Sequence, residues 1–191
     1  MRVSGGKAGG RILKVPKGLD VRPTPDLVKQ AIFNSLGERV VNARVLELFG
    51  GSGALSLEAL SRGAAHATCV ELSSKHARHI RDNLLSIGVE SSRFQLRVED
   101  AIKSLHHLAA ETAQFDLIFA DPPYGEKNVG RRSMSFAQQL LDHPNLPPLL
   151  APDGIFILGH TKRDTLEFPP TLKEIKLLKH GDTIMRFFKA S

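Results

Sequence analysis

The chain has 191 residues, of which 41% are hydrophobic and 24% charged. This composition is sufficient for one sizeable folded core and excludes an intrinsically disordered chain. A single cysteine, Cys69, excludes an internal disulfide, and no stretch approaches the roughly 20 apolar residues of a membrane-spanning helix. The first residues also lack the apolar run of a signal peptide, so we expect a cytoplasmic protein. We further expect it to act as a monomer.

The net charge of +6 is concentrated in the first quarter of the chain. Residues 1–44 contain nine Lys and Arg but three Asp and Glu, whereas the basic and acidic residues of the remainder cancel. Basic residues gathered on one segment are typical of a surface that binds a phosphate backbone. The alternative is a solvated arm that binds nothing, and charge alone does not choose between the two.

Two short strand-like pieces, residues 1–4 and 11–15, flank a glycine-rich stretch and predict a hairpin. We therefore expect residues 1–22 to form a basic β-hairpin extension and residues 23–191 to form the main domain. A helix follows, with Thr24 as the expected cap and Pro25 as its first residue. Gly37 is expected to end it.

From residue 44 onward, short apolar strands alternate with helices. Strands separated by helices predict βαβ units and a parallel sheet that is covered on both faces. The last two strands are joined by a short turn and should be antiparallel. The expected fold class is therefore α/β, a doubly wound, seven-stranded, mostly parallel sheet. The expected strands are 45–49, 67–71, 94–98, 115–120, 155–158, 175–178 and 184–188, and the expected helices are 54–62, 73–87, 101–110 and 136–141.

A glycine-rich loop, Gly50-Gly51-Ser52-Gly53, joins the first of these strands to a helix. Glycines at the carboxyl end of a strand let a ligand approach the backbone closely. Glu71 ends the second strand, where an acid accepts hydrogen bonds from ribose hydroxyls. Asp100 follows the third strand and is expected either at an adenine amino group or as a helix cap. The loop thus predicts an adenosine-containing ligand, and Glu47 favours S-adenosylmethionine because a carboxylate would repel the pyrophosphate of NAD.

The fourth strand runs directly into Asp121-Pro122-Pro123-Tyr124. The two prolines stiffen this loop and remove two N–H donors, which leaves it rich in acceptors. The Asp121 carboxylate and the Pro122 carbonyl can together accept both hydrogens of an exocyclic amino group, while Tyr124 stacks on the base. A rigid turn in which the tyrosine only packs is the alternative. The pattern indicates methyl transfer to an amino nitrogen on an sp² carbon, but it does not select the base.

The order of these motifs resembles the class I S-adenosylmethionine-dependent methyltransferases that act on amino groups of bases. Further stretches are similar to the RsmD family, whose members methylate N2 of a guanine in bacterial 16S ribosomal RNA. The resemblance covers nearly the whole chain, densely up to residue 124 and thinly beyond it. It is carried by Arg2-Val3, Gly5-Gly6, Gly10-Arg11, Leu13, Arg22-Pro23-Thr24, Phe33-Asn34-Ser35-Leu36, Leu48–Leu55 and Glu58–Ala64.

The resemblance implies a Rossmann-like methyltransferase fold, S-adenosylmethionine as the cofactor, and 16S ribosomal RNA as the substrate, in the small ribosomal subunit or its assembly intermediates. It places the guanine on Asp121, Pro122, Pro123 and Tyr124. The chain departs from the family at Glu47, where Asp is usual, and at Gly50, where Ala is usual. The expected cofactor-binding residues are Glu47, Phe49, Gly50, Gly51, Ser52, Gly53, Glu71, Leu72, Asp100 and Ala101, and the expected RNA-binding residues are Arg2, Lys7, Arg11, Lys14, Arg22 and Thr24.

Three alternatives stay open at the level of the residues. Acid-Pro-Pro-Tyr also serves adenine-N6 methyltransferases of DNA or RNA and methyltransferases of protein amides. A non-catalytic RNA-binding assembly factor that keeps the fold is the alternative from another class. No group of residues has the spacing of a metal site, so we expect no metal.

Overall fold

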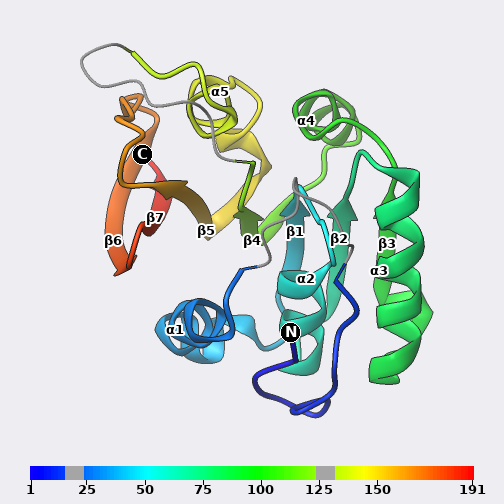
Figure 1. Ribbon diagram of the computed structural model, residues 1–191. Helices are drawn as coiled ribbons and strands as arrows, with labels where there is room; N and C mark the ends of the chain where they lie inside the picture. The colour runs from blue at the N-terminus through cyan, green and yellow to red at the C-terminus, as the bar shows by residue number, and fades with distance from the viewer. Residues whose placement is uncertain (16–23, 124–131) are drawn as a thin grey trace. The chain divides into compact units, whose positions relative to one another are not determined.

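The computed structural model describes residues 1–15, 24–123 and 132–191 of the chain (Figure 1). These residues divide into two units, Met1–Ala101 and Ile102–Ser191, each with its own strands and buried side chains. Within the described residues, no helix is both long and apolar enough to cross a membrane. The expected domain boundary after residue 22 lies outside the described residues, and the hairpin that precedes it is part of the first unit.

The first unit contains two parallel βαβ connections, as the sequence predicts. β1 pairs in parallel with β2, and β2 pairs in parallel with β3, so the strand order is β3-β2-β1. Parallel strands bring their carboxyl ends to one edge, which is where the loops with the candidate site residues lie. The elements are α1 (Asp26–Leu36), the 3-10 helix η1 (Gly37–Val40), β1 (Arg44–Leu48), α2 (Ala54–Ser61), β2 (His66–Val70), α3 (Ser74–Ile87), the 3-10 helix η2 (Ser91–Arg93), β3 (Phe94–Arg97) and α4 (Ala101–Ala110), which crosses into the second unit.

The ends of α3 follow the local signals in the sequence. The Ser73 side chain accepts a hydrogen bond from the backbone N–H of His76, and Gly88 ends the helix in a left-handed conformation. The start of α1 differs from its prediction by one residue, because Pro25 is the cap residue and the helix begins at Asp26. Thr24, the expected cap, precedes Pro25 and is buried.

The N-terminal segment forms the expected hairpin, and it is packed into the first unit rather than extended from it. Arg2 and Ile12 form an antiparallel bridge. The side chains of Val3, Ala8 and Leu13 are buried. The hairpin therefore contributes to the core, and removing it would expose apolar surface as well as remove charge.

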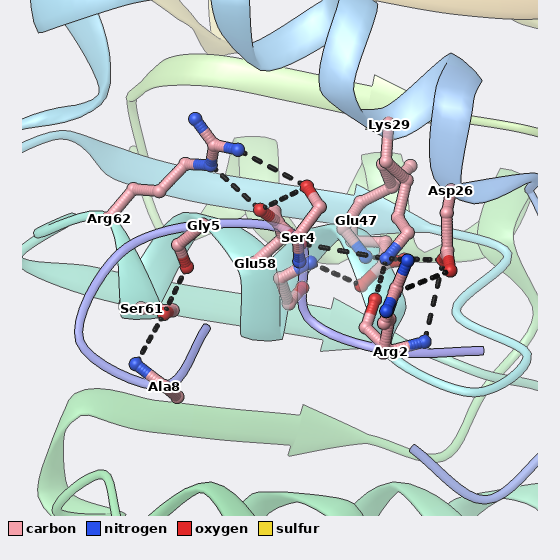
Figure 2. Close-up of polar contacts among 12 residues, drawn as sticks. Arg2, Ser4, Gly5, Ala8, Asp26, Lys29, Glu47, Glu58, Ser61 and Arg62 are labelled. Atoms are coloured by element: carbon pink, nitrogen blue, oxygen red, sulfur yellow. Dashed lines mark hydrogen bonds and ion pairs between the residues drawn. The ribbon is translucent and has the colours of Figure 1, made fainter. Parts of the chain in front are cut away.

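A cluster of buried charges connects the hairpin to α1 and α2 (Figure 2). The side chains of Lys29 in α1 and Glu58 in α2 have no exposed surface, and Nζ lies 3.5 Å from Oε2. Lys29 also lies 3.3 Å from Asp26 and donates a hydrogen bond to the carbonyl oxygen of Arg2. A buried ammonium is tolerated only with such partners, so the hairpin backbone is part of the Lys29 site.

The Glu58 carboxylate binds the hairpin directly as well. Its Oε2 accepts from the Ser4 N–H and its Oε1 from the Ser4 hydroxyl, both at 2.7 Å. Arg62, one turn along from Glu58, donates from Nε to Oε1 at 2.7 Å, and its guanidinium lies 5.1 Å from the centroid of the Phe33 ring. Both oxygens of this buried carboxylate are therefore held by charged or polar partners.

The turn of the hairpin lies against the end of α2. The Ser61 hydroxyl donates to the carbonyl of Gly5 at 2.6 Å and accepts from the N–H of Ala8 at 2.9 Å. Gly6 has a φ of +75°, and a Cβ built on it would overlap the Ser61 carbonyl. Glycine is required at this position because both the backbone conformation and the close approach exclude a side chain.

The second unit contains four strands in the order β4-β5-β7-β6. β4 and β5 are parallel, and β7 is antiparallel to both β5 and β6, which confirms the predicted final antiparallel pair. With the three strands of the first unit, seven strands are described. The strands are parallel within each unit except for β7 in the second, which confirms the α/β, mostly parallel fold class. The remaining elements are β4 (Phe115–Ala120), α5 (Phe136–Asp142), the 3-10 helix η3 (Pro147–Leu149), β5 (Leu150–Thr161), β6 (Leu172–His180) and β7 (Thr183–Ala190).

β5 is longer than the predicted strand 155–158. Its first part contains Pro152, Asp153 and Gly154, which are residues typical of turns. The register with β4 shifts between Phe115 and Leu117, and Asp153 has a φ of +63°. A β-bulge thus accommodates these residues inside the strand, where their types alone predict a break.

The buried Lys29–Glu58 pair gives a stability prediction. Glu58→Gln leaves Lys29 buried with a weaker set of partners, so the free energy of unfolding should fall by about 3–5 kcal/mol. Lys29→Met combined with Glu58→Gln should cost less than Glu58→Gln alone. Urea denaturation measures both, with the exposed substitution Glu38→Gln as the control. Lys29→Met alone completes the cycle, and a double variant whose loss of stability equals the sum of the losses in Glu58→Gln and Lys29→Met would contradict the coupling.

Candidate functional site in the first unit and the Asp-Pro-Pro loop

The backbone of the glycine-rich loop includes left-handed conformations, which residues other than glycine rarely adopt. Gly51 and Gly53 have φ angles of +56° and +73°, and Phe49, which is not a glycine, has a φ of +61°. The loop is fixed to β2 by the Gly50 N–H, which donates to the Val70 carbonyl at 2.8 Å. A strained non-glycine residue at the carboxyl end of a strand is typical of functional loops.

Gly50 has a second reason to be glycine, which is the neighbouring Cys69. A Cβ at position 50 would overlap the Cys69 sulfur. Cys69 is fully buried, as expected for a core residue, and burial raises the pKa of its thiol. The departure from the usual Ala of the family at Gly50 is therefore matched by the volume of Cys69 below it.

Glu71 lies at the end of β2 and holds the loop from the other side. Its Oε2 accepts from the Gly51 N–H and its Oε1 from the Ser73 N–H, both at 2.7 Å. His76 Nδ1 lies 3.4 Å from Oε1. The carboxylate is thereby oriented at the loop, next to the glycine backbone that a ligand would approach.

Glu47 lies in β1 below the loop and is 3% exposed. Its two carboxylate oxygens accept from the N–H groups of Leu55 and Ser56, at 3.2 and 2.9 Å, in the first turn of α2. Gly53, the cap residue of α2, has no side chain for this purpose, so Glu47 supplies the missing cap from the preceding strand. Both oxygens are bonded inside the protein, and a direct contact between Glu47 and a ligand stays a prediction.

The other expected cofactor residues surround this loop to different degrees. Leu72 follows Glu71 and is 69% exposed, so its side chain offers apolar surface next to the loop. Asp100 is half-buried in the connection between β3 and α4, and Ala101 after it is buried at the start of α4. Ser52 and Gly53 are buried within the loop. All ten expected cofactor residues belong to the first unit.

The Asp-Pro-Pro loop follows β4 in the second unit. Asp121 is half-buried, Pro122 is buried and Pro123 is exposed, whereas Tyr124 lies outside the described residues. A Cβ added to Gly159 of β5 would overlap the Asp121 carboxylate. The carboxylate thus lies over the backbone of β5, in space that a glycine leaves open.

The expected RNA contacts differ in their availability. Lys7 and Arg11 are exposed, and their side chains have no acidic partner within residues 1–15, 24–123 and 132–191. Arg2 lies 3.6 Å from Asp26, and Lys14 lies 3.8 Å from Asp82. The nearly buried Thr24 has little surface for a contact, and Arg22 lies outside the described residues.

Three residues of this arrangement were not singled out from the sequence. Glu58 and Ser61 bind the hairpin, and Asn83 of α3 bonds both the hairpin and the glycine loop. The sequence could have indicated a buried polar role for Asn83, because this residue lies on the apolar face of α3 with Ile80 and Ile87.

These strands, the glycine loop with its acid, and the strand that runs into Asp-Pro-Pro define the class of Rossmann-like methyltransferases. A family model described as conserved hypothetical protein 95 matches residues 1–189. YlbH of Bacillus subtilis (strain 168) is 34% identical over 179 residues, which cover 94% of this chain and 91% of YlbH. The chain therefore belongs to this family, the RsmD family, as the motifs indicated.

Two further comparisons agree with that assignment. The ribosomal RNA small subunit methyltransferase D of Escherichia coli (strain K12) is 37% identical over 124 residues, which cover 65% of this chain and 60% of that protein. The solved structure of the methyltransferase-like yhhF protein of Escherichia coli matches 100% of this chain and 98% of its own, with 28% identity and a TM-score of 0.76.

The buried Glu47 predicts a pH-dependent stability. Burial raises the pKa of this carboxyl group from its usual 4.5 to about 7, although the bonds from Ser56 and Leu55 oppose the shift. Because the folded pKa is the higher one, the contribution of Glu47 is fully present below pH 4.5 and is lost as the pH rises to about 7. Each pKa unit corresponds to about 1.4 kcal/mol.

Urea denaturation between pH 4.5 and 8 measures this contribution, with Glu47→Gln as the variant that does not titrate. The decline between pH 4.5 and 7 should be smaller in Glu47→Gln than in the unmodified protein. Equal pH dependence in the two proteins would show that Glu47 does not carry the effect.

Proposed function

We propose that this protein is an S-adenosylmethionine-dependent methyltransferase that modifies the exocyclic N2 amino group of a guanine in 16S ribosomal RNA. The observation that carries the proposal is that one chain contains both a glycine loop held by carboxylates and an Asp-Pro-Pro loop, each at the end of a parallel strand. The name of the Escherichia coli relative, a small-subunit ribosomal RNA methyltransferase, supports the RNA target. The choice of guanine N2 rests on the resemblance to the RsmD family.

The residues of the first unit fit S-adenosylmethionine chemically. Glu71 offers a carboxylate for ribose hydroxyls, and the half-exposed Gly51 backbone leaves room for a ligand. Leu72 offers an exposed apolar surface for the adenine, and Asp100 an acceptor for its amino group. Glu47 acts on the site indirectly, because its carboxylate accepts hydrogen bonds from the first turn of α2, where the glycine loop ends. When bound, S-adenosylmethionine supplies a methyl group on a positively charged sulfur.

The Asp-Pro-Pro loop holds the acceptor amino group in this proposal. The Asp121 carboxylate and the Pro122 carbonyl accept its two hydrogens, which leaves the nitrogen lone pair free to attack, and Tyr124 stacks on the base. An exocyclic amino group inside a paired helix is not accessible, so the guanine is brought out of its stack. No strong base is needed, because the nitrogen loses its proton during or after the attack. Positioning and electrostatics supply most of the rate.

The hairpin supplies the contacts to the RNA backbone. Among the basic residues of the described part of the hairpin, Lys7 and Arg11 have no acidic partner within the described residues, whereas Arg2 and Lys14 do, so phosphates are the natural partners of Lys7 and Arg11. Because the hairpin is bonded to α2 through Glu58 and Ser61, these cations are attached to the folded unit rather than to a solvated arm. This attachment favours the RNA-binding interpretation over that of an arm that binds nothing.

Methyl transfer tests the proposal with Asp121→Asn as the variant. Transfer of a labelled methyl group to unmodified small ribosomal subunits should fall about 100-fold or more, since a contact to the reacting amino group is lost. The affinity for S-adenosylhomocysteine, measured by calorimetry, should stay unchanged because Asp121 is assigned to the acceptor. Equal loss of activity and cofactor affinity would remove Asp121 from that role. Naked 16S RNA and duplex DNA serve as the comparison substrates.

The salt dependence of RNA binding tests the hairpin. Lys7→Gln combined with Arg11→Gln should weaken binding to small ribosomal subunits and lower the slope of log K against log salt by about 0.7–0.9 for each lost phosphate contact. Lys176→Gln combined with Lys179→Gln removes the same charge from exposed positions of β6 and serves as the matched control. Equal effects of the two pairs would indicate a response to net charge alone.

A further inference from the structure

The side chain of Asn83 connects two parts of the first unit that the proposed function uses separately. Asn83 lies on α3 and is 1% exposed. Its Oδ1 accepts from the backbone N–H of Lys14 at 2.7 Å, and its Nδ2 donates to the Lys14 carbonyl at 2.9 Å. The same Nδ2 donates to the carbonyl of Ser52, in the glycine loop, at 3.0 Å. One amide thus bonds the hairpin and the cofactor loop at once.

The orientation of this amide is fixed by its partners. The carbonyls of Lys14 and Ser52 can only accept, so both need an N–H, and the Lys14 N–H needs an acceptor. The Asn83 group has two N–H donors and one oxygen, and all three are used. Rotating the amide by 180° would turn its oxygen toward one carbonyl and its NH₂ toward an N–H. Any displacement of Lys14 therefore strains the bond to Ser52.

Three further contacts hold the loop and the start of α2 to elements other than the hairpin. Gly50 bonds to Val70 in β2, Gly51 bonds to Glu71, and the first turn of α2 bonds to Glu47. The Ser52 carbonyl lies between these fixed points, and its contact is Asn83. The hairpin, in turn, carries Lys14 on its second strand, close to the exposed Arg11.

We propose that Asn83 is a positioning residue that links RNA binding at the hairpin to cofactor binding at the glycine loop, so that each ligand raises the affinity for the other. The inference rests on the proposed function for the identity of the two ligands. A cofactor against the loop fixes Ser52, which fixes Asn83 and with it the Lys14 backbone. The RNA then meets a hairpin that has less freedom left to lose. By reciprocity, RNA on the hairpin favours the loop conformation that binds the cofactor by the same factor.

Binding of unmethylated small ribosomal subunits, with and without saturating S-adenosylhomocysteine, measures the link in the full-length protein. The dissociation constant of the unmodified protein should fall about 5-fold or more when S-adenosylhomocysteine is present. The ratio of the dissociation constant without S-adenosylhomocysteine to that with it measures the link, and in Asn83→Ala this ratio should approach one. In Asn83→Ser, a milder variant for use if the alanine variant does not fold, the ratio should be reduced.

Two matched controls separate the link from a loss of stability. Lys14→Ala keeps the backbone groups that Asn83 binds, so it should weaken subunit binding and leave the ratio intact. Ser61→Ala loosens the turn of the hairpin without touching Ser52, so it should lower the melting temperature and also leave the ratio intact. A purely structural Asn83 would instead change the ratio in proportion to the melting temperature in all variants.

The outcomes are distinct. A ratio of one in the unmodified protein, with both ligands bound, overturns the link but not the proposed function. A full ratio in Asn83→Ala and Asn83→Ser overturns the role of Asn83. Absence of binding of either ligand to the unmodified protein overturns the proposed function, and this inference with it.

Discussion

Glu58 of α2 has a buried carboxylate, and the packing of the hairpin, α1 and α2 in the first unit depends on how this charge is paired. A carboxylate without exposed surface is unfavourable unless it is paired and hydrogen-bonded. Here its partners come from three places, Lys29 of α1, Arg62 at the end of α2 and Ser4 of the hairpin. The N-terminal segment is therefore positioned by the electrostatic requirements of a buried helix. That same helix begins at the glycine loop, so the surface with the free cations and the loop that suits a cofactor are both attached to one rigid element.

Carboxylates shape the glycine loop as much as its glycines do. Glycine permits the positive φ angles of the loop, but it supplies no side chain to hold them. Glu47 caps α2 from below and Glu71 holds the Gly51 N–H from the side. These bonds hold Gly51 and the first turn of α2, whereas the Ser52 carbonyl between them is held by Asn83. This arrangement buries the carboxyl group of Glu47, and burial raises its pKa to about 7. The charged form therefore destabilises the fold at higher pH.

Local signals in the sequence predicted much of this fold and little of its long-range chemistry. The periodicity of α3, its cap Ser73 and its terminating Gly88 were readable because a helix and its ends depend on residues a few positions apart. The glycine loop, Glu71 and the Asp-Pro-Pro loop were readable because each follows a short apolar strand. The hairpin was predicted too, but its buried packing was not, since Glu58 and Asn83 meet it across more than fifty positions of the chain. The length of β5 was missed because a bulge admits residues that are typical of turns.

The identity of the methylated nucleoside decides whether this protein methylates guanine N2 in 16S ribosomal RNA. Small ribosomal subunits that lack the modification are incubated with the protein and methyl-labelled S-adenosylmethionine, and the 16S RNA is then digested to nucleosides and analysed by mass spectrometry. We expect label in N2-methylguanosine, at one site for each RNA molecule. Label in N6-methyladenosine or in ribosomal protein, or no transfer by a protein that binds the subunit, would contradict it.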